Sequence, residues 1–249
     1  THISWVLLTG EFAYKVKKPI RLSFLDYSTL ERRRRLCEEE LRLNRRLAPG
    51  LYLDVSTIRG TSQSPRIGGD GVALEYAVRM RQFAPVDELS ALLAAEAVSA
   101  EDVAALGASI ARFHAATAPA PEESEFGRPG TVQRVTLDNF AELRALPEAA
   151  QWREQLRVLE SRVCGLHDAL RLLMAERRAQ GRVRECHGDL HCGNVVRWTG
   201  ELTPFDGIEF DPALRYIDVV NDIAFLAMDL AERGHSELRR AVLQAWVET

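Results

Sequence analysis

Short apolar runs separated by turn residues dominate the first 81 positions of the chain. Runs rich in apolar and β-branched side chains, bounded by glycine or proline, are typical of strands. They cover residues 4–8, 12–17, 51–58 and 72–81. Between the second and third runs, leucines follow helical spacing after Ser28, and Glu31 stands at a capping-box position. We therefore expect a sheet with one helix over 28–47 and a plain turn over 60–71.

From residue 87 onward the apolar positions follow the period of an amphipathic helix. Helices are predicted over 87–95, 99–116, 139–146, 147–179, 217–232 and 236–247. A loop rich in proline and glycine covers 119–130, and a small β insert is expected within 182–206. A β-rich segment followed by a helical one, without internal repeats, indicates an α+β fold with two lobes. We place these lobes at 1–81 and 82–249.

Composition adds only broad limits to this picture. The chain has 249 residues, of which 46% are hydrophobic and 27% charged, as in an ordinary globular protein. Its net charge of −4 disfavours a nucleic-acid partner, and no apolar run reaches the roughly 18 residues of a membrane span. Four cysteines without a disulfide framework indicate a reducing compartment, which we expect to be the cytoplasm. Because Thr1 already stands beside a strand-like run, we expect a fragment of a longer protein.

The stretch from Cys186 to Asn194 carries the strongest chemical signal. It follows a short strand-like run and precedes a β-hairpin. Asn194 comes five residues after Asp189, and Asp206 ends the hairpin. Protein kinases use this order of groups: an Asp accepts the proton of the attacking hydroxyl, and Asn and a second Asp supply oxygen ligands for Mg²⁺. We therefore predict a phosphotransferase, although an Asp before a glycine also suits a plain turn.

The strand over 12–17 is expected to supply a lysine for the nucleotide phosphates. Side chains alternate along a strand, so Ala13, Lys15 and Lys17 share one face. Lys15 is our candidate, because a small Ala13 and an aromatic neighbour suit a covered strand. The opposing interpretation is that the lysines are solvated on an edge strand.

The helix over 28–47 is expected to present one acid to this lysine. Glu40 lies beside the apolar stripe of the helix and is our candidate, with Glu39 and Glu38 as alternatives. The opposing interpretation is that these acids, together with the preceding run of four arginines, form a solvated helix face.

Zinc offers another interpretation of the polar loop. Cys186, His187, His191 and Cys192 are of the residue types that bind it. However, Cys186 and His187 are adjacent on an extended backbone and point in opposite directions, and the sequence has no second Cys/His cluster. A zinc site would also leave the Asp and Asn of the loop unexplained. We expect His187 to brace the loop through hydrogen bonds instead.

Asp222 is the acid that we expect to support this loop. It lies within the largely apolar helix over 217–230, where a carboxylate is costly unless it is hydrogen-bonded. The N–H groups of the polar loop need acceptors. We therefore expect Asp222 to accept from N–H groups within 187–189. The alternatives are that Asp222 faces solvent or that Asp218 is the buried acid.

Three further polar residues have open roles. His114 stands on a predicted helix and is expected to be a packed core residue rather than a catalyst. Glu209 and Asp211 follow Asp206 closely, so they either meet a substrate or are solvated loop acids.

The motif His187-Gly188-Asp189-Leu190-His191 with Asn194 resembles the signature of the aminoglycoside phosphotransferase and choline kinase family, small-molecule relatives of protein kinases. Segments 41–49, 75–80 and 217–226 resemble a bacterial branch of this family, in which the phosphotransferase domain is often fused to a P-loop ATP-binding domain. The resemblance covers nearly the whole chain.

This resemblance implies a two-lobed protein-kinase-like fold that uses ATP and Mg²⁺. The roles that it implies are a catalytic base at Asp189, metal ligands at Asn194 and Asp206, a phosphate lysine at Lys15 paired with Glu40, adenine contacts at a hinge containing Glu75 and Ala77, and support from His187 and Asp222. The nucleotide loop is expected at or before residues 1–4. The chain has no P-loop pattern, so a P-loop domain would be a fused or separate partner.

Three functions remain open at this point. The first is a kinase that phosphorylates a hydroxyl of a small molecule of the aminoglycoside, sugar or amino-alcohol type. The second is a catalytically silent module that binds nucleotide or a partner. The third, a protein kinase, is disfavoured because Asp206 is followed almost directly by the helix expected at 217, which leaves no room for an activation segment. An aminoglycoside would need an acidic cleft, for which the loop over 122–125 is only suggestive.

Overall fold

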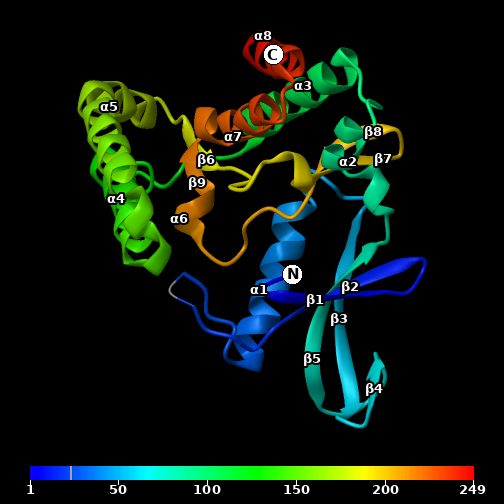
Figure 1. The fold of residues 1–249 in the computed structure, drawn as a ribbon. Coiled ribbons are helices and arrows are strands. Elements are labelled where there is room, and N and C mark those ends of the chain that lie inside the picture. Colours follow the sequence, from blue (N-terminus) through cyan, green and yellow to red (C-terminus); the bar gives the residue numbers. More distant parts are fainter. Residues whose placement is uncertain (23) are drawn as a thin grey trace.

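The first lobe is a curled, five-stranded antiparallel sheet with one long helix against it (Figure 1). A computed structural model describes residues 1–22 and 24–249. The strand order is β1-β2-β5-β3-β4, and helix α1 packs against β5 and β3. The elements are β1 (Ser4–Leu8), β2 (Phe12–Lys17), α1 (Leu30–Asn44), β3 (Tyr52–Thr61), β4 (Ser64–Ile67) and β5 (Ala73–Arg81).

The ends of two predicted elements differ in this lobe. Helix α1 is capped by Thr29 rather than Ser28, because the Thr29 hydroxyl accepts a hydrogen bond from the N–H of Arg32. The helix ends at Asn44 instead of residue 47. The predicted turn over 60–71 contains β4, an exposed strand without an alternating apolar pattern, which pairs with β3.

The second lobe is mainly helical, with two short antiparallel strand pairs, β6 with β9 and β7 with β8. Its helices are α2 (Leu89–Ala94), α3 (Ala100–Ala116), α4 (Pro129–Ala145), α5 (Arg153–Ala179), α6 (Pro212–Arg215), α7 (Val219–Glu232) and α8 (Ser236–Glu248). Its strands are β6 (Val183–Glu185), β7 (Val195–Trp198), β8 (Glu201–Pro204) and β9 (Tyr216–Asp218), and its 3₁₀ turns are η1 (Pro85–Asp87), η2 (Pro147–Trp152) and η3 (Cys192–Asn194).

Three helix boundaries in this lobe were predicted wrongly. Helix α4 begins ten residues before the predicted 139, with Pro129 in its first turn, where the missing N–H of proline costs nothing. The predicted helix over 147–179 is divided into η2 and α5. Helix α7 begins at Val219 rather than 217, because the preceding residues pair with β6 as strand β9.

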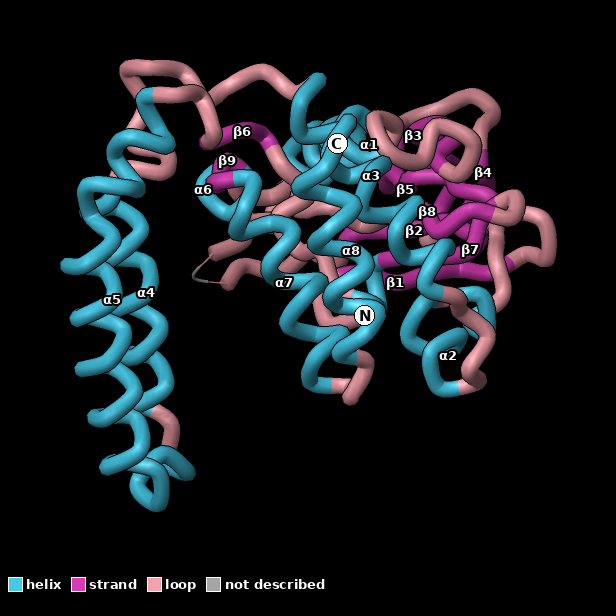
Figure 2. The backbone as a smooth tube through the Cα atoms, turned by 90° about the horizontal axis from the view of Figure 1, so that it is seen from above, coloured by secondary structure: helices cyan, strands magenta, loops and turns pink. Residues whose placement is uncertain are grey.

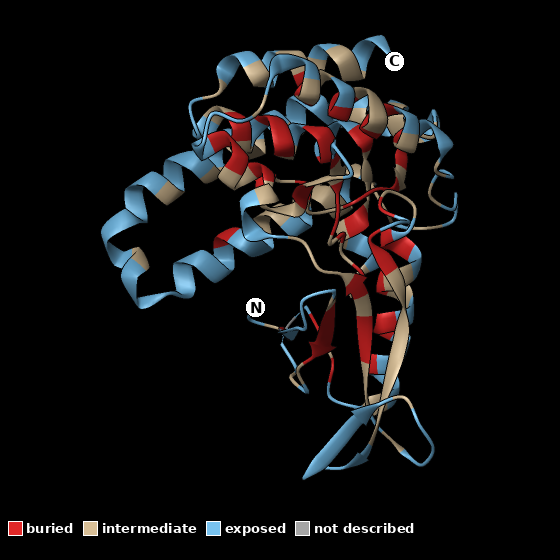
Figure 3. Ribbon diagram, turned by 90° about the vertical axis from the view of Figure 1, so that its right-hand side faces the viewer, coloured by how far each residue is buried: buried red, intermediate tan, exposed pale blue. Residues whose placement is uncertain are grey.

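Two apolar clusters fix the polar loop between the lobes. One joins α2, α3, α7 and α8 and includes Leu190, a residue of the loop itself. The other joins the sheet and α1 to Val196 and Phe205, which flank the loop and Asp206. Figure 3 shows that both lobes contain buried residues. The loop is thus anchored from both lobes.

The hairpin of α4 and α5 stands beside the rest of the second lobe (Figure 2). Helix α5, which is described over its full length, has no buried residue, and Phe140 is the buried one in α4. Within residues 1–22 and 24–249, none of the helices combines the length and the apolar character needed to cross a membrane.

The predicted fold class is confirmed: the chain is α+β and two-lobed, with a curled antiparallel sheet first and a mainly helical second lobe. Strand β5 ends at Arg81, where we place the end of the first lobe.

Candidate active site

The polar loop over 187–194 leads from β6 to β7 and ends in the turn η3. Within it, the side-chain amide of Asn194 donates to the carbonyl oxygen of Asp189 at 2.9 Å and to its carboxylate at 3.0 Å. The Asp189 N–H in turn donates to Nδ1 of His187 at 3.3 Å. The carboxylate side chain of Asp189 remains 41% exposed. The loop therefore brings together the predicted base and one predicted metal ligand, and leaves the base accessible.

Asp206 is held next to this loop by groups from both lobes. Its N–H donates to the Tyr52 hydroxyl at 3.0 Å, and the N–H of Gly207 donates to Oδ1 of Asn44 at 2.8 Å. The His187 imidazole donates from Nε2 to the carbonyl oxygen of Phe205 at 2.8 Å. Asp206 adopts a φ of 62°, a left-handed conformation that aspartate tolerates better than most residues.

Lys15 joins Asp206 to helix α1. Its Nζ lies 2.9 Å from Oε1 of Glu40 and also contacts the Asp206 carboxylate. Lys17, two residues further along β2, lies 2.6 Å from the other Glu40 oxygen. Strand β2 is flanked by β1 and β5, and both lysines are buried. The alternative of solvated lysines on an edge strand is therefore wrong.

The charges of Lys15, Lys17 and Glu40 keep these three groups ionised. Burial raises the pKa of Glu40, but the two ammonium groups outweigh it and bring the pKa down to about 2. Burial lowers the pKa of Lys15, but the charges of Asp206 and Glu40 outweigh it and raise that pKa well above its usual value. The site therefore holds a permanently charged lysine beside Asp206.

Lys17 and Glu209 are the residues that the sequence analysis missed. Glu209 is buried and contacts both the Lys17 ammonium and the Tyr27 hydroxyl, so it is neither a solvated acid nor free to meet a substrate. Asp211 caps helix α6 by accepting from the N–H of Ala213. The alternation along β2 placed Lys17 beside Lys15, but nothing in the sequence indicated which loop acid it would meet. We call Lys15, Lys17, Glu40, Asp206 and Glu209 the interlobe network.

Glu40 is the only one of the three candidate acids that faces the lysines. Glu38 is exposed, whereas Glu39 belongs to a second set of ion pairs. In this set Arg215 lies 2.7 Å from Glu39 and 3.1 Å from Glu185. Arg42 of helix α1 contacts the same two acids, each at 2.7 Å. We call these four residues the arginine bracket, because they fasten α1 to the second lobe.

Asp222 supports the loop from helix α7, with the contacts that we expected. Its Oδ2 accepts from the N–H of His187 at 3.1 Å, and its Oδ1 accepts from the N–H of Gly188 at 2.9 Å. His114 is buried and lies 3.0 Å from Oδ2 through Nε2, while its Nδ1 accepts from the Trp246 indole at 3.0 Å. Both alternatives for Asp222 are therefore wrong, since it is buried and Asp218 is the half-buried cap of α7.

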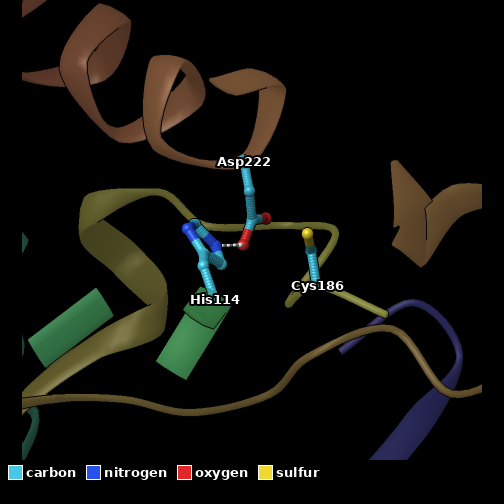
Figure 4. Close-up of side chains that lie close together, drawn as sticks. All are labelled: His114, Cys186 and Asp222. Atoms are coloured by element: carbon cyan, nitrogen blue, oxygen red, sulfur yellow. Dashed lines mark hydrogen bonds and ion pairs between the residues drawn. The ribbon is translucent and has the colours of Figure 1, made fainter. Parts of the chain in front are cut away.

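His114, Cys186 and Asp222 are the one group in the described residues whose donor atoms lie close enough to suggest a metal site, within 4.8 Å of one another (Figure 4). Both ring nitrogens of His114 and both carboxylate oxygens of Asp222 already have partners. Burial raises the pKa of the Cys186 thiol well above its usual value, so it stays protonated. This group is therefore a hydrogen-bonded support and does not suit a metal.

His191 and Asp229 complete the surroundings of Asp189. Nε2 of His191 lies 3.6 Å from Oδ2 of Asp189, and Asp229 accepts from the N–H of Cys192 at 2.8 Å. The interaction with His191 lowers the pKa of Asp189 and raises that of His191. Asp189 is therefore ionised at neutral pH and can accept a proton.

Glu75 and Ala77 do not form a hinge. They lie in the middle of β5, where Ala77 pairs with Val16 on one side and Ser56 on the other. Glu75 forms an ion pair with Arg33 of helix α1 at 2.8 Å. The sheet continues to Arg81, so the connection between the lobes begins at Gln82. The prediction was wrong because the strand-like run over 72–81 shows no internal end.

The oxygen atoms of Asn194 and Asp206 fit a hard divalent cation. Asn194 uses its amide nitrogen on Asp189, which leaves its side-chain oxygen for a ligand role. The carbonyl oxygen of Asn194 accepts from the N–H of Phe205 at 2.9 Å, so the residue before Asp206 is fixed beside Asn194. Carboxylate and amide oxygens are the ligands that Mg²⁺ prefers.

The sequences of two other proteins align with most of this chain. An "Uncharacterized protein Rv2004c" of Mycobacterium tuberculosis and an "Uncharacterized protein Mb2027c" of Mycobacterium bovis are each 32% identical to it over 238 residues. The alignment covers 96% of this chain and 46% of each relative, so the chain spans about half the length of the curated relatives that it matches.

Comparison with solved structures gives a streptomycin-ATP-APH(2″)-IIa ternary complex, with 16% identity, a TM-score of 0.41, and coverage of 98% of this chain and 78% of that one. A likeness of this size carries no argument about substrate. The sequence model of the phosphotransferase enzyme family matches residues 26–249. This chain therefore belongs to the phosphotransferase enzyme family, also known as the aminoglycoside phosphotransferase family, as its loop motif led us to expect.

Proposed function

We propose that this protein uses Mg²⁺ and ATP to phosphorylate a hydroxyl group of a small molecule. The observation that carries the proposal is the continuous set of contacts from Glu40 through Lys15 to Asp206, beside the hydrogen-bonded pair of Asp189 and Asn194. A phosphoryl transferase needs these groups: a cation for the phosphates, oxygen ligands for a metal, and a base.

In the proposed reaction, Asp189 orients the acceptor hydroxyl and takes its proton. The hydroxyl oxygen forms a bond to the γ-phosphorus, the bond from that phosphorus to the β–γ bridging oxygen breaks, and ADP leaves. Lys15 would bind the phosphates, and Asn194 and Asp206 would hold the metal. Bound Mg²⁺ would neutralise the charge that develops on the phosphates.

The short connection after Asp206 supports a small acceptor. Only residues 207–211 separate Asp206 from α6, and Glu209 within them is buried against Lys17. Protein kinases place a long activation segment here, between the metal Asp and the following helices. We therefore propose a small-molecule acceptor of the alcohol type. A P-loop partner domain and a cytoplasmic location stay predictions from the sequence.

Calorimetry with ATP in Mg²⁺ and in EDTA tests the proposal first. We expect binding that requires Mg²⁺, and formation of ADP when an acceptor is added. Equal ATP affinity in both conditions would remove the metal roles of Asn194 and Asp206. Metal-dependent ATP binding without transfer to any acceptor would favour a catalytically silent nucleotide-binding module.

A further inference from the structure

A cavity of about 560 Å³ lies between the α4–α5 hairpin and helix α7. Its floor includes Gly188 of the polar loop, and α6 and β9 close one side. Figure 2 shows the α4–α5 hairpin standing beside α7. Pockets that hold small ligands typically measure about 300–1,000 Å³, so this cavity has room for an acceptor.

The walls of this cavity are mostly apolar and aromatic. The rings of Phe126 and Tyr216 stack at 4.8 Å between centroids with an interplanar angle of 7°. Val135, Met174 and Met228 add aliphatic surface from the two flanking sides. Val135 and Met228 are themselves exposed, 36% and 59%. Exposed apolar side chains gathered around a cavity indicate a ligand with an apolar body.

The charged side chains of the cavity are already paired. Among the described residues that line it, the acids are Asp218 and Asp222. Both oxygens of Asp218 are bound by Arg177 at 2.7 Å, and those of Asp222 are bound by the loop N–H groups and His114. The remaining charged side chain is Arg134, an exposed cation that lies 3.5 Å from Asp138. An ammonium group that entered would lose water without gaining a carboxylate, which is costly.

Two residues of the cavity lining, Phe225 and Gly188, are close to the surroundings of the base. Phe225 lines the cavity, and its ring lies 5.8 Å from the ring of His191. His191 in turn lies 3.6 Å from the Asp189 carboxylate. Gly188, which lines the floor, directly precedes Asp189. The cavity therefore borders the loop at the residue next to the base.

We propose that the acceptor is an uncharged alcohol with an aromatic or aliphatic body, bound in this cavity, and not a polycationic aminoglycoside or an amino alcohol. This inference rests on the proposed function, since the transfer is the same: the alcohol oxygen bonds to the γ-phosphorus, the β–γ bridge bond breaks, ADP leaves, and Asp189 takes the proton. The uncharged polar groups of Asn221 and Thr131 remain to orient such a ligand.

The test compares acceptors in the presence of Mg·ATP. The probes are 2-phenylethanol and 4-phenyl-1-butanol against kanamycin, choline and glucose, with ADP release and ³¹P NMR of the phosphomonoester as readouts. Two variants with the same substitution accompany them. Ala224→Trp fills the cavity from α7, whereas Ala175→Trp places the same ring on an exposed position of α5 that does not line it.

We expect the aryl alcohols to show a kcat/KM at least about tenfold above those of kanamycin, choline and glucose, because a matched pocket discriminates by this order. Ala224→Trp should raise the KM for aryl alcohols by about tenfold or more, and Ala175→Trp should leave it within about twofold.

Preference for kanamycin, choline or glucose, or aryl-alcohol turnover that Ala224→Trp does not affect, overturns the inference. Metal-dependent ATP binding without any turnover of the aryl alcohols also overturns it, while the proposed function stands. Absence of metal-dependent ATP binding overturns the proposed function itself, and the inference with it.

Discussion

The polar loop over 187–194 and the α4–α5 hairpin border the same cavity, but they are held in opposite ways. The loop donates backbone N–H hydrogen bonds to the carboxylates of Asp222 and Asp229, and its Leu190 is only 1% exposed. In the hairpin, none of the described residues of α5 is buried, and Leu172 is 83% exposed. The groups that we propose to react therefore lie on firm support, whereas the proposed wall of the acceptor site can change at little cost to the fold.

The largest effect should follow from changing the base within the rigid region. Asp189→Asn keeps size and the bond from Asn194 but cannot take a proton, an effect worth about 10²–10⁴ in rate. We expect near-normal Mg·ATP binding by calorimetry and strongly reduced ADP release with acceptor. Unchanged transfer would remove Asp189 from its role.

A substitution of Lys17 measures how much the interlobe network contributes to stability. Lys17→Met removes the cation that pairs with the buried Glu209 and one of the two cations that pair with Glu40, and breaking such a buried pair typically costs about 3–5 kcal/mol of stability. Urea unfolding measures the loss. Lys18→Met, on the next residue and only half-buried, is the control and should change stability by less than about 1 kcal/mol. Equal effects of the two variants would show that the network adds no stability.

A leucine-to-alanine substitution in the polar loop and another in the hairpin test directly whether the two regions differ in packing. Leu190→Ala removes a packed side chain from the loop and should cost about 2–5 kcal/mol. Leu172→Ala in the hairpin should stay within about 0.5 kcal/mol. Chemical denaturation of both variants gives the two values. A large loss for Leu172→Ala would mean that the hairpin is packed in solution.

Two acids at the start of α7 provide a smaller contrast. Asp222→Asn replaces an oxygen that accepts from buried N–H groups and should cost about 1–3 kcal/mol. It should also reduce transfer, because the loop that carries Asp189 loosens. Asp218→Asn, on a half-exposed ion pair with Arg177, should cost about 0–1 kcal/mol. Similar losses in thermal unfolding would contradict the supporting role of Asp222.

The smallest effect concerns pH and the two loop histidines. Burial lowers the pKa of His187, so the unfolded chain takes up its proton first and stability falls as the pH falls through about 6.5. Contact with Asp189 raises the pKa of His191, so its stabilisation is present below about pH 6.5 and is lost as the pH rises through its folded value. Between about pH 7.5 and 5.5, His187→Gln should lessen the fall in Tm and His191→Gln should deepen it. Parallel Tm profiles for both variants would contradict these signs.

Local spacing explains what the sequence analysis could predict. Asp189, Asn194 and Asp206 are near one another in the chain, and helical periodicity places Glu40 beside the apolar stripe of its helix. The pairing of Glu40 with Lys15 came from the arrangement of protein kinases. The contact of Asp222 followed from a burial argument, because an acid in an apolar helix needs donors.

Long-range packing explains what it could not predict. Glu209 meets Lys17 across 192 positions, and no local pattern distinguishes a buried loop acid from a solvated one. The register between β5 and its two neighbours decides that Ala77 is mid-strand, and register is a property of three segments. The cavity is built from the hairpin, α6, β9 and α7 together, so it exists only after folding.

The arginine bracket has a consequence for regulation. Helix α1 carries Glu40, and in a kinase-like protein an outward swing of such a helix would separate the acid from its lysine and switch the site off. Here such a swing would have to pull Glu39 away from Arg215, a guanidinium that is 6% exposed, and Arg42 away from Glu185. The ion pairs of the arginine bracket therefore disfavour the outward, inactive position of α1. We therefore expect helix α1 to stay in its active position. The rate of the proposed transfer would then depend on the concentrations of the protein and of its acceptor.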